Sequence, residues 1–307
     1  MPPSGRPSLS ITLPDRPLTR FAPSPTGFLH LGHVVNAVYV WGLARAHDGR
    51  VILRLEDHDR GRCRPEYEAA LLDDLEWLGL EPDLGRPSAS GPSPWRQSDC
   101  GAVYQEALSM LSAQGLVFGC DCSRREIDAV AGGVVDRETP YPGRCRERGL
   151  PTDAGGVRLR MASGTERFID ARLGEQQQEP AAQCGDMLLR DRLGQWTYQF
   201  AVAVDDMRQG VDLVIRGEDL LESTGRQIRL AHLLGRARPP VFYHHPLIRK
   251  PGGAKLSKAA GDSGIRDLRA AGYSAEDVLG RAAHLGGLLD EPRPVGVGEL
   301  AGLFSHR

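Results

Sequence analysis

Every lysine of this chain lies in one short Gly-rich segment, RKPGGAKLSK at residues 249–258. Lys250, Lys255 and Lys258 stand there, whereas every other cationic side chain of the 38 Lys+Arg total is an arginine. An ammonium is a compact point charge on a flexible stem, while a guanidinium is a planar fork. A solvated loop is the usual explanation of a basic run. A chain this poor in lysine has no compositional reason to gather three, so we expect a loop that places ammonium groups on phosphates.

Two histidines near the other end of the chain offer a partner site. In PSPTGFLHLGH, His30 and His33 are three residues apart at the start of a predicted helix, and that spacing puts both on one face. Gly27 and Gly32 let the backbone approach a ligand closely, and a helix N-terminus has free N–H groups that suit a phosphate chain. Surface histidines beside a cap are the alternative, but the flanking glycines favour imidazoles that donate hydrogen bonds to phosphate.

A third group of side chains that could do chemistry is a set of cysteines. Cys120 and Cys122 stand in CDC, and Cys145 ends PYPGRC beyond a Gly-rich stretch. Three thiolates could hold a tetrahedral zinc ion, with Tyr141, four residues before Cys145, as an unusual fourth ligand. Thiols without metal are the alternative, and the spacing alone does not decide between the two.

The first half of the chain alternates predicted strands and helices. Strands are expected at 18–22 and 50–57, and helices over HLGHVVNAVYVWGLARAHDG and at 66–80. This order is typical of a parallel sheet covered by helices. A linker at 82–94 and a helix at 101–117 follow. Residues 118–190 are then rich in Cys, Gly, Arg and Gln, and we expect an insertion or subdomain there.

Regular patterning returns in the second half of the chain. We expect strands at 196–206, 211–217 and 241–248, a helix at 223–235 opened by a Ser/Thr cap, and two short helical stretches at about 264–286. The last strand runs into the lysine segment. Parallel strands bring their carboxyl ends to one edge of a sheet, where such folds bind ligands. The histidine turn and the lysine loop are therefore expected to meet on one triphosphate, an arrangement suited to nucleotidyl transfer.

The composition narrows the class of protein. With 307 residues, 40% hydrophobic and 25% charged, and a net charge of -2, the chain is typical of a soluble globular protein without a global basic field, although a local groove could still bind nucleic acid. No apolar run approaches the ~20 residues of a membrane span. Residues 1–17 have no apolar core of a secretory signal. We expect a cytoplasmic monomer with reduced cysteines and no membrane partner.

Several of these segments resemble motifs of one enzyme family. HLGH resembles the HIGH motif, and KLSKA at 255–259 the KMSKS motif, of class I aminoacyl-tRNA synthetases. RFAPSPTGFLHLGH is similar, nearly letter for letter, to the opening of glutamyl-tRNA synthetases, and RLEDHDRGR, YQFAVAVDD and IRGEDLLESTGRQ follow in that family's order. Both motifs in order with these blocks are a specific signal. The resemblance covers roughly 18–260 and implies activation of L-glutamate by ATP with Mg²⁺.

The resemblance also implies which residues bind the substrates. Arg20 at a strand end can grip a carboxylate as a fork, Glu56 can take the ammonium, Arg216 offers a second cation and Tyr198 a hydroxyl. Arg54 and Asp57 are expected to be structural. The implied catalytic residues are His30, His33 and Lys258. The implied ATP contacts are Pro23, Gly27, His30, Gly32, His33, Lys255 and Lys258. The implied glutamate contacts are Arg20, Phe21, Ala22, Pro23, Ser24, Glu56, Tyr198 and Arg216.

One branch of the family fits the cysteines and the length. The glutamyl-queuosine branch has a Cys-x-Cys…Tyr-x3-Cys zinc site in this insertion, which implies one structural zinc on Cys120, Cys122, Tyr141 and Cys145. Only 49 residues follow Lys258, whereas an ordinary glutamyl-tRNA synthetase has a helical anticodon-binding region there. The branch implies glutamate activation without tRNA, and then transfer to the cyclopentene ring of queuosine at the wobble position of tRNA(Asp).

The expected fold class is α/β, a doubly wound, Rossmann-like parallel sheet with an inserted zinc-binding subdomain and a short helical C-terminal region. Expected divisions are a disordered lead-in at 1–17, catalytic halves at 18–117 and 191–260, the insertion at 118–190 and C-terminal helices at 261–307. Two other functions stay open: a truncated ordinary glutamyl-tRNA synthetase that charges the tRNA 3′ end, and a regulator that binds glutamate or tRNA without catalysis. Length counts against the first, and the intact histidine pair and lysine loop count against the second.

Overall fold

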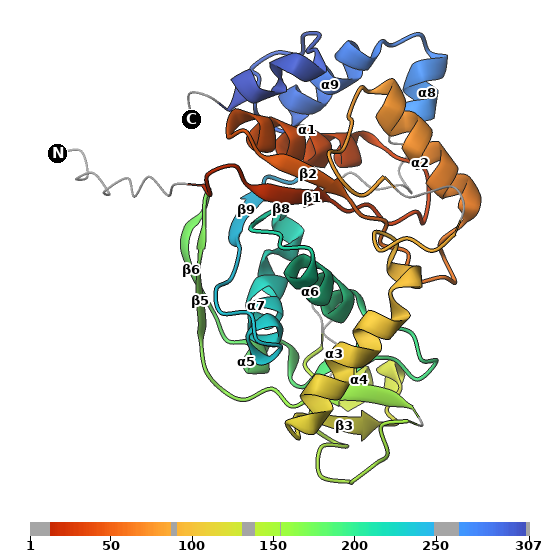
Figure 1. Cartoon of the computed structure of the whole chain (residues 1–307), viewed down its shortest axis with the longest axis vertical. Helices are drawn as coiled ribbons and strands as arrows, with labels where there is room; N and C mark the ends of the chain where they lie inside the picture. The colour runs from red at the N-terminus through yellow and green to blue at the C-terminus, as the bar shows by residue number, and fades with distance from the viewer. Residues whose placement is uncertain (1–12, 87–90, 131–138, 154, 249–263, 305–307) are drawn as a thin grey trace, which may run out of the picture.

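A computed structural model of the chain describes residues 13–86, 91–130, 139–153, 155–248 and 264–304 (Figure 1). The three lysines, including Lys255 and Lys258 of the expected ATP site, lie outside these described residues. Among the described helices, none is long and apolar enough to cross a membrane.

The centre of the molecule is a largely parallel sheet. Strands β1 (Leu18–Phe21) and β2 (Arg50–Leu53) pair in parallel, as do β8 (Leu213–Gly217) and β9 (Val241–His245). The backbone N–H of Asp212 donates to Leu18 O at 3.0 Å and sets β1 beside β8. Strand β5 (Glu166–Asp170) meets β9 in parallel, and β6 (Gly174–Gln178) pairs antiparallel with β5. The strands therefore follow one another as β2, β1, β8, β9, β5 and β6.

Alternating side chains of these strands enter two different hydrophobic clusters. In β8, Leu213 and Ile215 join the cluster around helix α1 (Leu31–Ala46), whereas Val214 joins a cluster that includes Ile228 of helix α7 (Thr224–Leu233). Strand β2 divides in the same way, with Ile52 on the α7 side. Side chains alternate across a strand, so a sheet buried on both faces has helices on both faces. The structure is thus the Rossmann-like α/β fold expected from the sequence.

The remaining helices cover these faces or extend the molecule. Helix α1 is buried almost all round because α9 and η4 pack over the side away from the sheet, as Figure 1 shows at the top of the molecule. The bounds of the other helices are α2 Pro65–Trp77, η1 Gln97–Asp99, α3 Gly101–Ala113, α4 Arg124–Val130, α5 Pro180–Cys184, α6 Tyr198–Arg208, η2 Glu218–Ser223, α8 Ile265–Ala270, α9 Ala275–Leu285 and η4 Val297–Leu303.

A second, smaller sheet lies at the opposite end of the molecule from α8 and α9 (Figure 1). It consists of β3 (Val117–Cys120), β4 (Gly156–Leu159) and β7 (Met187–Arg190), all antiparallel. Residues 118–190 therefore contribute strands to both sheets. After β4 the chain returns to the central sheet to form β5 and β6, and then goes back to the small sheet as β7.

The structure differs from the sequence expectation at two elements. Residues 196–206 were expected to form a strand, but Tyr198–Arg208 is helix α6. Phe200, Ala201 and Val202 are all fully buried. A helix buried on several sides loses the periodicity that identifies it, and its apolar run then resembles a buried strand. Helix α7 also lacks the expected cap, because Ser223 makes no capping hydrogen bond and accepts from the Gln199 side chain at 2.9 Å instead.

Candidate active site and cysteine cluster

The first strand-to-helix turn fixes the tautomers of its two histidines. His30 is the N-cap of α1, and its Nδ1 accepts from the Gly32 backbone N–H at 3.0 Å. Nδ1 of His33 accepts from the His30 backbone N–H at 3.1 Å. A neutral imidazole has one acceptor and one donor nitrogen. Both rings therefore present Nε2–H as a donor, which is the group that a phosphate oxygen requires.

Gly32 has a steric reason to be glycine. The cap bond folds the His30 ring back over residue 32, and a Cβ there would lie 2.8 Å from His30 Cε1 and 3.0 Å from Nδ1. A larger residue would displace the ring, so the glycine of the HLGH motif serves the histidine as well as any ligand. The two rings lie together, with centroids 4.0 Å apart.

A cavity of about 270 Å³ joins these histidines to the carboxyl ends of β8 and β9. His245 of β9 lines the cavity from the α1 side of the sheet, where its ring stacks on Tyr39 of α1 and its Nε2 lies 3.1 Å from Asn36 Oδ1. Burial lowers the pKa of His245 to about 4, so this imidazole is neutral near pH 7. The described lining residues are His30, Gly32, His33, Val35, Asn36, Gly217, Asp219, His245, Pro246, Leu247 and Ile248.

The described residues on each side of the lysine segment both lie at this turn. Ile248, which precedes the segment, lines the cavity. Gly264, which follows it, forms a β-bridge with His30, and the Ile265 N–H donates to Leu29 O at 3.0 Å. The two described neighbours of this segment, Ile248 and Gly264, therefore both lie beside the HLGH motif.

The other face of the sheet carries a group of polar side chains at its carboxyl edge. Leu18 of β1 and Val214 of β8 face the α7 cluster, so Arg20 and Arg216, two residues further along each strand, lie on that same face. Both arginines are buried, with exposed fractions of 4%. On this face of the sheet, each strand thus carries an apolar side chain first and a guanidinium group near its carboxyl end, at the edge where this fold binds ligands.

Arg20 is held by an acid from helix α6. Its Nε donates to Asp206 Oδ1 at 3.0 Å and its Nη1 to Ile215 O at 3.2 Å. Burial would raise the pKa of Asp206, but the charges of Arg20 and Arg54 outweigh burial and lower it to about 2. The remaining guanidinium nitrogen, Nη2, has no partner among the described residues, so it can still meet a substrate carboxylate.

Arg216 is fixed on three sides. Its Nε donates to His244 Nε2 at 3.0 Å, its Nη1 to Gln227 Oε1 at 2.7 Å and its Nη2 to Thr224 Oγ1 at 2.9 Å. His244 is fully buried, and its Nδ1 lies 2.6 Å from Asp170 Oδ2 of β5. Because Nε2 of His244 accepts from Arg216, Nδ1 must donate to Asp170. An Asp–His pair from neighbouring strands therefore orients the guanidinium, and burial lowers the pKa of His244 so that the ring stays neutral.

Glu56 and Tyr198 complete this group. Glu56 is buried, its Oε1 accepts from Arg54 Nη2 at 3.0 Å, and burial raises its pKa. Tyr198, half-buried on α6, interacts electrostatically with Glu56, Arg216 and Arg20. Burial and then the charge of Glu56 raise the pKa of its hydroxyl to about 12, so the phenol keeps its proton. The structure thus brings together Arg20, Glu56, Tyr198 and Arg216.

Residues 21–24 approach this group mainly through their backbone. The Phe21 ring is buried in the core against Trp41, with ring centroids 5.4 Å apart, so only its main chain faces the site. Pro23 O accepts from the Glu56 N–H at 3.1 Å, and Ser24 Oγ lies 3.9 Å from Cys63 Sγ. Ala22 lies between these contacts, half-buried, and Gly27 lies on the same loop before His30.

Arg54 and Asp57 have structural contacts. Arg54 is fully buried and ion-pairs with Glu56, Asp205 and Asp206. Asp57 accepts from the Ser98 backbone at 2.8 Å and from its hydroxyl at 2.6 Å. Arg54 thus makes the structural ion pairs expected of it, and Asp57 is held by hydrogen bonds instead.

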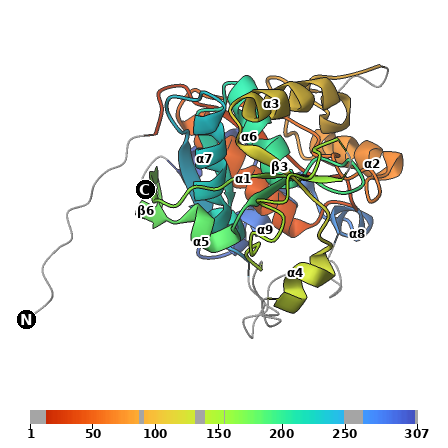
Figure 2. The same ribbon diagram turned by 90° about the horizontal axis from the view of Figure 1, so that it is seen from below.

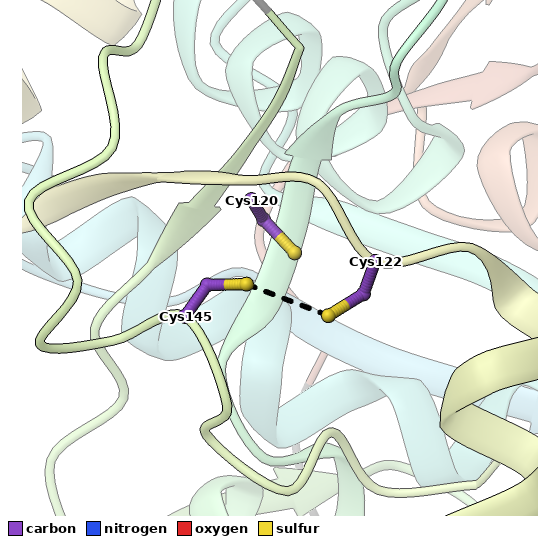
Figure 3. A group of neighbouring side chains, drawn as sticks. All are labelled: Cys120, Cys122 and Cys145. Atoms are coloured by element: carbon purple, nitrogen blue, oxygen red, sulfur yellow. Dashed lines mark hydrogen bonds between the residues drawn. The ribbon is translucent and has the colours of Figure 1, made fainter.

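The cysteine cluster forms a separate centre at the small sheet (Figure 3). Sulfur atoms of Cys120, Cys122 and Cys145 all lie within 4.8 Å of one another, and no disulfide joins them. The Tyr141 hydroxyl lies 3.6 Å from Cys120 Sγ and 3.8 Å from Cys122 Sγ. Four ligands about 2.3 Å from a tetrahedral zinc ion are roughly 3.8 Å apart. The donor set therefore fits a metal ion, with the tyrosine oxygen in the fourth direction.

The surroundings shift the pKa values of two of the cysteine thiols in opposite directions. Cys120 is buried, but hydrogen bonds from Tyr141 and Arg158 outweigh burial and lower its pKa. Burial and the neighbouring Cys145 raise the pKa of Cys122 to about 11. Arg158 Nε lies 3.3 Å from Cys120 Sγ, and its guanidinium stacks 3.8 Å over the Tyr141 ring. A buried arginine thus supplies positive charge beside the cluster.

Sequence reasoning did not find the residues that hold the substrate-facing arginines. Asp206 lies in YQFAVAVDD, a block that carried the resemblance but was expected to be a strand, and a helix was needed to aim it at Arg20. Asp170 comes from the insertion and His244 from the last strand, and only the pairing of β5 with β9 brings them together. A polar side chain within an apolar strand was the signal that could have identified His244.

Comparisons with known proteins agree with this geometry. Residues 18–287 match the family model "tRNA synthetases class I (E and Q), catalytic domain". A glutamyl-Q tRNA(Asp) synthetase of Symbiobacterium thermophilum is 43% identical over 93% of this chain and 91% of its own length. One of Bordetella bronchiseptica is 50% identical over 79% of this chain and 75% of its own length.

A solved structure supports the fold. The glutamate tRNA ligase of Elizabethkingia meningosepticum superimposes with a TM-score of 0.77 at 28% identity, covering 93% of this chain and 64% of that ligase. This chain thus spans about two thirds of the ligase's length. The chain belongs to the family of class I tRNA synthetases for glutamate and glutamine, and it is an enzyme of the ligase type.

Proposed function

We propose that this protein activates L-glutamate with ATP in the absence of tRNA and transfers it to the queuosine base of tRNA(Asp). Proteins named glutamyl-Q tRNA(Asp) synthetase are similar to the chain over most of its length, which favours this acceptor. We further propose that the protein acts in the cytoplasm as a monomer.

One observation carries the proposal. Two sites meet at a single sheet edge, one on each face. The α1 face has the cavity with the Nε2–H donors of His30 and His33, and the other face has Arg20 and Arg216 with Glu56 between helices and sheet. An ATP on the first face would direct its α-phosphate toward a glutamate on the second. A regulator that only binds glutamate has no use for paired imidazole donors.

In the first step the glutamate α-carboxylate attacks the α-phosphate, and pyrophosphate leaves. His30 and His33 donate hydrogen bonds to phosphate oxygens, and Mg²⁺ accompanies ATP as part of the substrate. Lys258 offsets the charge of the leaving group, and Lys255 positions the segment. Arg20 and Arg216 hold carboxylate oxygens, Glu56 accepts from the ammonium, and the protonated Tyr198 donates a hydrogen bond.

The cysteine cluster would hold one structural zinc through Cys120, Cys122 and Cys145, with Tyr141 as the fourth ligand. Zinc in this position would stabilise the connections of the small sheet. A cavity of about 400 Å³ opens beside the cluster and is lined in part by Arg124, Arg158 and Arg192. Basic side chains suit the phosphates of an RNA loop, so we propose that the acceptor tRNA meets the protein here.

The test compares activation with transfer. Glutamate-dependent exchange between ATP and pyrophosphate is measured without tRNA, and transfer of labelled glutamate is measured to tRNA(Asp) with and without queuosine. The proposal expects exchange without tRNA and transfer only to the modified tRNA. Exchange that requires tRNA, with label on the 3′ end, would instead identify a glutamate–tRNA ligase, and no exchange under any condition would identify a binding protein.

A further inference from the structure

One histidine beside the residues expected to bind glutamate has an orientation that suits a general base. His58 follows β2 by a few residues and is half-buried. Its Nδ1 lies 2.8 Å from Gln97 Oε1, its ring centroid is 6.2 Å from that of Tyr198, and it interacts electrostatically with Glu56. The resemblance to known motifs assigned this imidazole no role.

A buried carboxylate determines which nitrogen of His58 carries the proton. Gln97 is buried, and its Nε2 donates to Asp205 Oδ2 at 2.8 Å. That oxygen also accepts from the Tyr104 hydroxyl at 2.9 Å, and Arg208 Nε donates to Oδ1 at 2.7 Å. The Asp205 carboxylate thus accepts hydrogen bonds from every one of these groups, including the Gln97 NH₂. The Gln97 amide must therefore present its oxygen to His58. His58 Nδ1 is therefore the N–H donor, and its lone pair is on Nε2.

That lone pair is available. The described residues give Nε2 of His58 no hydrogen-bond partner. Asp57, between Glu56 and His58, turns to Ser98 instead, so Glu56 and His58 share the side that faces Tyr198. The ammonium that Glu56 would accept is attached to the carbon next to the carboxyl group that reacts. A base beside Glu56 is therefore near the carbonyl carbon of a bound glutamyl-adenylate.

We propose that Nε2 of His58 is the general base of the transfer step, an inference that rests on the proposed function. The acceptor hydroxyl gives its proton to Nε2 as its oxygen forms a bond to the glutamyl carbonyl carbon. The bond between that carbon and the adenylate oxygen breaks, AMP leaves with the electron pair, and the imidazolium then returns its proton to water. Asp205, acting through Gln97, holds the ring in the required tautomer.

The test is His58→Asn. The asparagine Nδ2 stands near the position of Nδ1 and can still donate to Gln97 Oε1, but no base remains at the Nε2 position. His284→Asn is the matched control. His284 lies on α9, is also half-buried, and has its Nδ1 3.0 Å from Leu289 O. Three quantities are measured for each: exchange of ATP with pyrophosphate, single-turnover transfer from preformed glutamyl-adenylate to queuosine tRNA(Asp), and trapping of the adenylate by hydroxylamine.

We expect transfer by His58→Asn to fall about a hundredfold more than its exchange and its hydroxamate formation, because general-base catalysis contributes on the order of 10²–10⁴. Hydroxylamine is nucleophilic enough not to need the base. His58→Ala should recover part of its transfer rate when imidazole is added.

The outcomes separate this inference from the function beneath it. Wild-type protein that forms no glutamyl hydroxamate would contradict the proposed function and the inference with it. Wild-type transfer that His58→Asn slows no more than exchange would overturn the role of His58 alone. A raised KM for glutamate in exchange, with transfer reduced only in proportion, would show that His58 binds the amino acid and is not the base.

Discussion

At the scale of single residues, the charged side chains at the sheet edge are buried, and ion pairs fix their positions. Arg20, Arg54 and Asp206 form one buried network in which each charge has a partner. An unpaired charge in such a place would be strongly destabilising. The network therefore fixes Arg20 before any substrate arrives, which is the condition for an arginine to recognise a carboxylate at low entropic cost.

The Asp206 pKa gives this network a pH dependence. It lies near 2, below the ordinary 3.8, so the ion pairs stabilise the fold above pH ~4 and lose that contribution as the pH falls toward 2. The shift corresponds to about 2 kcal/mol at neutral pH. Urea unfolding should show Asp206→Asn destabilised at pH 7, with a gap to wild type that narrows toward pH 3. A gap that stays constant across this range would contradict the assignment.

The lysine segment supports a prediction at the same scale. Lys258→Arg keeps the charge but replaces a point charge with a planar fork, so exchange of ATP with pyrophosphate should fall about tenfold or more. Lys250→Arg, a change of the same kind in the same segment, is the control and should have little effect. Equal rates for wild type and Lys258→Arg would remove Lys258 from the mechanism.

At the scale of elements, the pairing of β5 with β9 supports the arginine of β8. Asp170 of β5 orients His244 of β9, and His244 orients Arg216. Strands β5, β8 and β9, which are distant in the sequence, therefore hold one guanidinium group in place together. The two strands β5 and β9 share the register pair of Asp170 with Phe242, and the His244 backbone N–H also donates to Asp170 Oδ2 at 3.0 Å.

Two substitutions at His244 separate its contacts. A glutamine oxygen stands near the Nε2 position and can still accept from Arg216, whereas an asparagine amide stands near Nδ1 and can only donate to Asp170. The KM for glutamate in the exchange assay should therefore rise more for His244→Asn than for His244→Gln, by about tenfold for one lost charged hydrogen bond. The reverse order would show that the Asp170 contact matters more than the Arg216 contact.

Sequence patterns predicted those elements whose two faces differ or whose ends are marked by turns. Strands are confirmed within the expected ranges 18–22, 50–57, 211–217 and 241–248, each shorter than its range, and the helix after HLGH is confirmed as well. Helix α6 was missed because burial on several sides removes its periodicity. The candidate residues came from motifs, whereas Asp206, Asp170 and His244 depend on tertiary pairing that a single sequence does not display.

At the scale of the whole molecule, the cysteine cluster belongs to the small sheet and the candidate substrate residues belong to the central sheet, which Figure 1 shows at different heights along the longest axis. Figure 2 views the molecule from below, from the end where β3 lies. We predict one zinc per chain by metal analysis, and a lower content in Cys120→Ser. Cys100→Ser, at a buried cysteine outside the cluster, is the control and should keep its metal. Removing the metal with a chelator should reduce transfer to tRNA more than exchange. Wild-type protein without zinc would retire the metal site.

The path of the chain between its two sheets limits how the protein can be rebuilt. Strand β5 pairs with β9 and β6 pairs with β5, while β4 before them and β7 after them belong to the small sheet. Residues 118–190 therefore cannot be removed as one unit by cutting the chain at two points. Such an excision would strip an edge from the catalytic half and leave His244 without its aspartate. An exchange of small sheets between relatives, made to alter which RNA is recognised, would need four junctions and would have to leave the β5–β6 hairpin with its own sheet.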